Sequence, residues 1–142
     1  MHEDTLARAA LFNSLDKKEL QALASECQER SFDTGATIIK QDTSGTGLYI
    51  ITSGHGKIVK EHGPDRAEEE LGTFGPGSVI GEMALLDDLP RSANVVATEP
   101  VVALVLPVWA FRGTVRNHPE IAIKLLSVLS KRLRKLESKD DQ

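Results

Sequence analysis

The segment of residues 81–93 combines residue types that could bind a phosphorylated sugar. It begins with Gly81, and glycine lets a backbone approach a ligand closely because it has no Cβ. The good helix formers at residues 82–86 predict a short helical turn whose first N–H groups are free to bind a phosphate. Arg91 can add a planar fork of donors to the same anion. An ionised Glu82 only accepts hydrogen bonds, which suits the hydroxyls of a sugar. The segment therefore predicts a nucleotide cradle.

The pair of Glu82 and Arg91 has two other interpretations. A salt bridge that caps a turn is the usual role of such a pair, but the flanking Gly, Pro and Ser-Ala favour a ligand here. As a general base, Glu82 would be poorly suited, because a neighbouring cation lowers the pKa of an acid. We therefore predict a binding site without catalytic residues, in a protein that is not an enzyme. The four histidines are isolated and lack the spacing of metal ligands, so we predict no metal site.

The elements before this segment read as one helix followed by strands. Asp16 and Glu19 form a capping-box pattern, flanked by Leu15 and Leu20 as a hydrophobic staple. Leucine and cysteine then repeat at helical spacing as far as Cys27. From residue 31 to residue 106 short β-branched runs alternate with Gly, Pro, Asp and Ser turns, which is typical of a sandwich or barrel. These runs are residues 37–39, 49–52, 57–59, 94–96 and 101–106.

The pattern after Pro107 is helical again. One helix buries a face that includes Phe111, and a break at His118-Pro119 precedes a longer helix over about residues 120–138. The longer helix has two apolar faces. We expect the first to pack on the barrel: Ile121, Leu125 and Val128. The second could join two copies in a weak homodimer: Leu126, Leu129, Leu133 and Leu136. Basic residues near its end complement the helix dipole, an interpretation that we favour over a nucleic-acid or membrane patch.

Composition excludes several classes of protein. The 142 residues fit one domain, and 17 Lys and Arg against 21 Asp and Glu give a net charge of −4. This acidic balance argues against a protein that mainly holds nucleic acid. The sequence has neither a membrane-span pattern nor a secretion-signal pattern. Its single cysteine, Cys27, cannot form an internal disulfide, and we expect it to be packed in the core. A cytoplasmic location is therefore predicted.

Residues 81–93 resemble the phosphate-binding cassette of the cyclic nucleotide-binding domain family. The matching parts are Gly81-Glu82, the apolar run at 83–86, and Pro-Arg-Ser-Ala at 90–93. Residues 48–54, 74–78 and 117–119 resemble flanking parts of the family pattern. One departure is Ile80, where many relatives carry Phe. It keeps an apolar contact.

This resemblance implies an α+β fold, an antiparallel β-roll or jelly-roll barrel with a flanking N-terminal helix and two C-terminal helices. On this basis residues 1–142 form one domain. The expected parts are N-terminal helices at 1–30, a β-roll at 31–106, C-terminal helices at 107–138 and a tail at 139–142. Many bacterial relatives carry a helix-turn-helix domain after the last helix. We expect a stand-alone domain without one, and hence no direct DNA binding.

The resemblance also implies roles for single residues. Glu82 should accept a hydrogen bond from the ribose 2′-hydroxyl, Arg91 should pair with the cyclic phosphate, and Ser92 should add its hydroxyl and amide. The remaining ligand-binding residues are Gly81, Met83, Ala84 and Ala93. In the family, Thr at the position of Ser92 tends to accompany guanine, so Ser92 favours cAMP over cGMP.

A switch is implied as well. Ligand capture should draw the cassette inward, and Leu85 or Leu86 should then let the last helices swing about a hinge at Phe111 and Asn117 to Pro119. The switched surface would act on an effector protein whose identity the sequence does not give. The alternative is an interaction or scaffold module that keeps the fold and binds no ligand.

Overall fold

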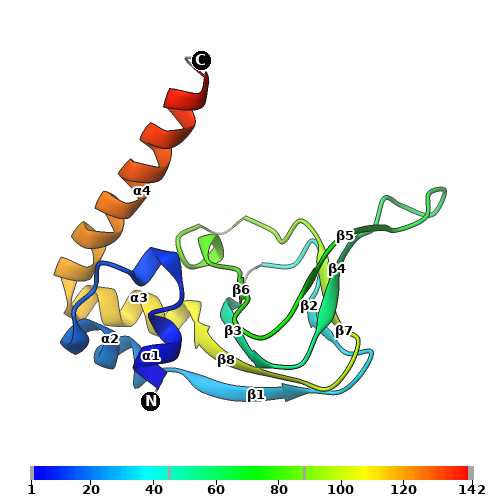
Figure 1. Cartoon of the computed structure of the whole chain (residues 1–142), viewed down its shortest axis with the longest axis horizontal. Coiled ribbons are helices and arrows are strands. Elements are labelled where there is room, and N and C mark those ends of the chain that lie inside the picture. The colour runs from blue at the N-terminus through cyan, green and yellow to red at the C-terminus, as the bar shows by residue number, and fades with distance from the viewer. Residues whose placement is uncertain (1, 45, 88, 141–142) are drawn as a thin grey trace.

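The computed structural model describes residues 2–44, 46–87 and 89–140, so part of the tail expected at 139–142 lies outside the described residues. Helices gather at one end and strands at the other, and α4 projects away from both (Figure 1). The helical elements are α1 (His2–Leu6), η1 (Ala10–Phe12), α2 (Lys17–Ala24), η2 (Met83–Leu85), α3 (Val108–Asn117) and α4 (Pro119–Asp140), where η marks a 3-10 turn. The strands are β1 (Gln28–Phe32), β2 (Thr37–Ile39), β3 (Gly47–Ser53), β4 (Gly56–Lys60), β5 (Glu69–Phe74), β6 (Val79–Ile80), β7 (Asn94–Ala97) and β8 (Val101–Pro107).

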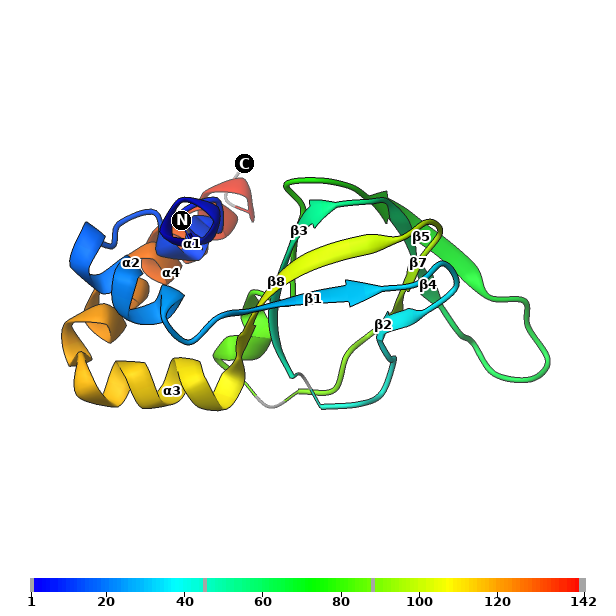
Figure 2. The same ribbon diagram turned by 90° about the horizontal axis from the view of Figure 1, so that it is seen from below.

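Two antiparallel sheets of four strands form the roll. Their strand orders are β1-β8-β3-β6 and β2-β7-β4-β5. Strands β3 and β8 lie at the centre of the first sheet, with Tyr49 opposite Val105. Figure 2 shows the roll at one end of the molecule and the helices at the other. This arrangement confirms the predicted α+β fold class.

Alternation along β3 divides the core into two clusters. Successive side chains of a strand point to opposite faces. Tyr49 and Ile51 accordingly pack inside the roll with residues of β7 and β8. Leu48 and Ile50 instead pack against the helices, in a cluster that includes Phe12 and Phe111. One strand therefore joins the interior of the roll to the helical end.

Helix α2 begins as predicted. The Asp16 carboxylate accepts from the Glu19 N–H at 2.8 Å, and the Asp16 N–H donates to the Glu19 carboxylate at 2.9 Å. This reciprocal pair satisfies two N–H groups that a helix start leaves without partners. Leu23 is fully buried and Cys27 is partly buried in the helical cluster, as the spacing predicts.

The sequence pattern does not predict three of the strands, β1, β5 and β6. Each lies at the edge of its sheet. Edge strands are partly solvated and carry charged residues, so β1 and β5 lack the β-branched pattern of a central strand. The expected boundary at residue 31 is therefore wrong, because the roll already begins with β1 at Gln28.

The two C-terminal helices break where the sequence predicts. His118 leaves helical geometry, and Pro119 is the first residue of α4, a position where its missing N–H costs nothing. Ile121 and Leu125 are buried, as expected of the first apolar face. On the second face Leu126, Leu133 and Leu136 are exposed. Leu129 does not belong to this exposed face as predicted, because it is partly buried against the helical cluster.

Among the described residues, every helix is too short or too polar to span a bilayer.

Candidate functional site

Gly81 and Arg91 lie against each other beside β3. The Arg91 Nη2 donates to the carbonyl of Gly47 at 2.8 Å. Gly81 has a φ of +83°, and a Cβ at this position would stand 2.5 Å from Arg91 Nη1 and 2.7 Å from the Gly47 oxygen. Only glycine fits here, because both the left-handed backbone and the close approach exclude a side chain. The structure therefore brings together the first and third parts of the cassette pattern.

The guanidinium of Arg91 is an incompletely satisfied cation. It is half-buried, and its Nε is buried without a hydrogen-bond partner among the described residues. Burial lowers the pKa of Arg91, while the nearby Tyr49 and Asp87 oppose that shift. An unpaired buried donor costs free energy unless something accepts from it. The chemistry of this site therefore suits an anion.

Backbone hydrogen bonds hold the segment that carries Arg91 in place. Its N–H donates to the Thr43 carbonyl at 2.9 Å, and its carbonyl accepts from the Asp42 N–H at 2.8 Å. Asp42 has a φ of 65°, an uncommon conformation that Asp tolerates better than most residues. The turn that contains Asp42 thus holds the end of the cassette by backbone hydrogen bonds.

Glu82 has partners that the sequence analysis did not foresee. One carboxylate oxygen accepts from the Leu11 N–H at 3.0 Å, and the other lies 2.8 Å from Arg132 Nη2 in α4. Glu82 thus pairs with Arg132 and not with Arg91, which rules out a cap made of the Glu82–Arg91 pair in this structure. In the sequence the only signal for Arg132 is the cluster of basic residues near the end of α4, and a role in complementing the helix dipole does not predict this contact.

The cassette turn is a short 3-10 turn, η2. The Ala84 N–H donates to the Gly81 carbonyl at 3.1 Å. The prediction that this amide is free is therefore wrong. Met83 is exposed. Leu85 is buried in the helical cluster together with Phe111, whereas Leu86 lies at the surface. Of the two predicted switch residues, Leu85 is thus the one packed in the same cluster as the hinge residue Phe111.

The remaining predicted site residues lie around this arrangement. Ser92 is exposed and Ala93 is buried just before β7. Asn117 ends α3 and Pro119 begins α4. Among the described residues, no group of three or more His, Cys, Asp or Glu could hold a metal ion.

Comparison with known proteins decides the family. The family described as the cyclic nucleotide-binding domain matches residues 29–118. This chain belongs to that family. As a cyclic nucleotide-binding regulatory domain, it is similar to the CRP-like cAMP-activated global transcriptional regulator of Mycobacterium tuberculosis, with 34% identity over 133 residues. That match covers 94% of this chain and 59% of the relative. The cyclic AMP receptor protein of Thermus thermophilus is also 34% identical, over 89% of this chain and 58% of the relative.

Solved structures agree with this cyclic nucleotide-binding fold. The N-terminal domain of a transcriptional regulator from Streptomyces coelicolor has a TM-score of 0.85 and 32% identity, and the match covers 96% of this chain and 94% of that one. The regulatory domain of Toxoplasma gondii PKA, crystallised with cAMP, has a TM-score of 0.74 and 25% identity, over 95% of this chain and 49% of that one. The chain spans less than two thirds of the length of the curated relatives named above.

Proposed function

We propose that this domain binds a cyclic nucleotide at residues 81–93, favours cAMP over cGMP, and acts as a regulatory sensor that switches its C-terminal helices. One observation carries the proposal. Arg91 is half-buried, its Nε has no hydrogen-bond partner among the described residues, and its guanidinium lies in space that a side chain at position 81 would fill. A singly charged cyclic phosphate needs one well-placed cation, and a hydrogen bond between such charged groups is worth about 1.5–3 kcal/mol.

The proposed contacts follow the predicted roles, with one restriction. Arg91 pairs with the phosphate, and Ser92 adds its hydroxyl and amide, with the amides of Met83 and Ala93 beside it. The Ala84 amide joins the cradle only if it gives up the Gly81 carbonyl. Glu82 accepts from the ribose, and each of its oxygens can take a second hydrogen bond beside Leu11 or Arg132. Ser92 in place of Thr is the reason to favour cAMP.

The proposed switch acts through two links between the cassette and the helices. Leu85 of η2 lies in one buried cluster with Phe111 of α3. Glu82, at the start of the same turn, pairs with Arg132 of α4. A ligand that moves residues 82–85 therefore alters the packing of α3 and the anchoring of α4. It can shift this equilibrium only by the difference in its affinity for the two states.

Titration calorimetry with cAMP tests the binding site. Replacing Arg91 by Ala removes the cation, and we expect affinity to fall about 10-fold or more. The Arg66→Ala variant, altered at an exposed arginine in the loop between β4 and β5, should bind as the wild type does. Unchanged affinity in the Arg91 variant would show that the cradle lies elsewhere.

A scaffold that keeps the fold and binds nothing is the alternative function. Thermal melting separates the two, because a ligand that binds only the folded state raises Tm as its concentration exceeds Kd. A Tm that neither cAMP nor cGMP changes favours the scaffold. A larger shift with cGMP than with cAMP contradicts the proposed preference.

A further inference from the structure

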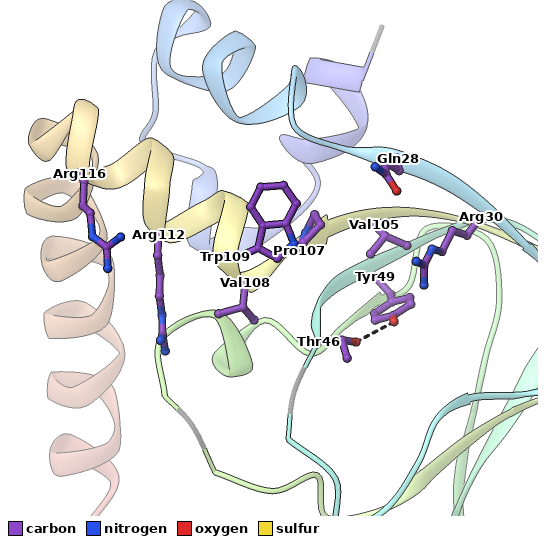
Figure 3. Close-up of a pocket in the computed structure, with 10 residues that line it drawn as sticks. All are labelled: Gln28, Arg30, Thr46, Tyr49, Val105, Pro107, Val108, Trp109, Arg112 and Arg116. Atoms are coloured by element: carbon purple, nitrogen blue, oxygen red, sulfur yellow. Dashed lines mark hydrogen bonds between the residues drawn. The ribbon is translucent and has the colours of Figure 1, made fainter.

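A concave surface lies away from the cassette residues. It is a groove of about 810 Å³ between the edge strand β1 and helix α3 (Figure 3). Arg30 of β1 stands on one side, and Arg112 and Arg116 of α3 stand on the other. We call this surface the β1–α3 groove. None of the predicted ligand-binding residues lines it.

The charge of the β1–α3 groove is opposite to that of the whole chain. Among the residues that the structure describes, its lining contains three arginines and no Asp or Glu, although the chain has a net charge of −4. Arg30 and Arg116 are exposed, and neither forms an ion pair with any residue that the structure describes. Two guanidinium groups thus remain available for carboxylates from outside the domain.

The groove also has a large apolar surface at its rim. Trp109, the only tryptophan of the chain, is 71% exposed there. Tryptophan and arginine are the residue types that most often dominate the energy of protein–protein contacts. Exposure of such a side chain costs hydrophobic free energy that a partner would recover.

The floor of the groove is already fixed. Tyr49 and Val105 are buried, and the Tyr49 hydroxyl bonds to Thr46 Oγ1 at 2.9 Å (Figure 3). Both lie on central strands of the first sheet. A rigid floor reduces the entropy that is lost when a partner binds.

We propose that the β1–α3 groove binds an acidic segment of another protein. Carboxylates of that segment pair with Arg30 and Arg116, and an apolar side chain covers Trp109. A small polyanion fits these observations less well, because the arginines stand on two sides of the groove and Trp109 would stay uncovered. None of the residues proposed to bind the nucleotide lines this groove, although its floor residue Tyr49 lies near Arg91.

Fluorescence anisotropy tests the proposal with a labelled peptide in which glutamate alternates with leucine. We expect it to bind the intact chain, and its glutamine counterpart to bind far more weakly. The double variant Arg30→Glu/Arg116→Glu should weaken binding about tenfold or more, and Trp109→Ala by a similar factor. The matched control Arg8→Glu/Arg66→Glu makes the same charge change at exposed sites outside the groove and should retain binding.

Three results would overturn the proposal. The first is that the acidic peptide fails to bind. The second is that groove and control variants lose affinity equally, which would indicate nonspecific charge attraction. The third is that the binding of inorganic triphosphate, and not the binding of the peptide, depends on Arg30 and Arg116. The groove would then be a small-anion site. Melting curves of each variant establish that it folds, and amide shifts across residues 28–32 and 107–117 locate the bound peptide.

Discussion

At the scale of single residues, the site depends on the absence of a side chain as much as on a charge. Gly81 holds a left-handed backbone and touches the Arg91 guanidinium where other residues would carry a Cβ. Arg91 is in turn directed by the Gly47 carbonyl. Its Nε nevertheless has no acceptor in the part of the chain that the structure describes. The guanidinium is thus held in place, but its hydrogen-bonding capacity is only partly satisfied by the described residues.

A Gly81→Ala variant tests this arrangement. We expect it to lose more than about 1 kcal/mol of stability from backbone strain, and to lose cAMP affinity because Ala would displace Arg91. Gly63→Ala is the matched control, since Gly63 also has a positive φ, of +102°, but has nothing within 4 Å of its Cβ position. Denaturation and calorimetry should show strain in both variants and lost binding only in Gly81→Ala. Normal cAMP binding by Gly81→Ala would contradict this account.

Cys27 gives a pH-dependent prediction. Burial raises the pKa of its thiol to about 12, whereas an exposed thiol has a pKa of about 8.5. As the pH rises, the unfolded chain therefore loses this proton before the folded chain does. The stability contributed by the protonated thiol is complete below about pH 8.5 and is lost progressively above it. The free energy of unfolding, measured in urea, should fall more between neutral and alkaline pH in the wild type than in Cys27→Ala. An identical pH dependence of the two would refute the burial effect.

At the scale of elements, α4 is anchored at two positions by charge. Near its start Lys124 pairs with the buried Glu19 of α2. Farther along, Arg132 pairs with Glu82 of the cassette. The first anchor ties α4 to the N-terminal helices, and the second ties it to the residue expected to meet the ribose. Only the second anchor would sense a ligand directly.

Hydrogen exchange tests the second anchor. An Arg132→Ala variant should exchange the amides of residues 128–138 several-fold faster, because this part of α4 loses its link to the cassette. Arg134→Ala, at an exposed position on the same helix, should leave these rates near those of the wild type. Equal exchange in both variants would mean that the ion pair does not restrain α4.

At the scale of the whole molecule, an apolar surface of α4 has no covering element among the described residues. Leu126 is 64% exposed, Leu133 58% and Leu136 60%. Because this part of α4 extends away from the roll (Figure 1), a second copy could pack along it. The face is short, and sustained heptads are usually needed for a stable coiled coil. The predicted homodimer is therefore a weak one.

Analytical ultracentrifugation tests this homodimer. Replacing Leu133 and Leu136 by Ser should raise the dimer dissociation constant about tenfold or more, because it removes apolar surface that the dimer would bury. Leu71→Ser, at a half-exposed leucine of β5, should leave self-association unchanged. A wild-type chain that is monomeric at high concentration would rule out the dimer.

The sequence alone determined the fold class and the parts of the cassette. Central strands, the capped helix α2 and the break at Pro119 follow from local patterns that tertiary contacts reinforce. The edge strands β1 and β5 could not be predicted in this way, because they are partly solvated and carry few of the residues that mark a strand, whereas the edge strand β2 has the predicted run Thr-Ile-Ile. The small-residue pattern at 81–93 was likewise enough to identify the family.

Tertiary structure alone decided how the side chains of the site are engaged. Glu82 pairs with Arg132 across 50 positions of sequence and accepts from the Leu11 amide, contacts that no local spacing encodes. The same holds for the β1–α3 groove, whose arginines lie on a strand and a helix that are far apart in the chain. Backbone preferences and apolar periodicity are local properties, whereas the partner of a charged side chain depends on which distant elements the folded core brings beside it.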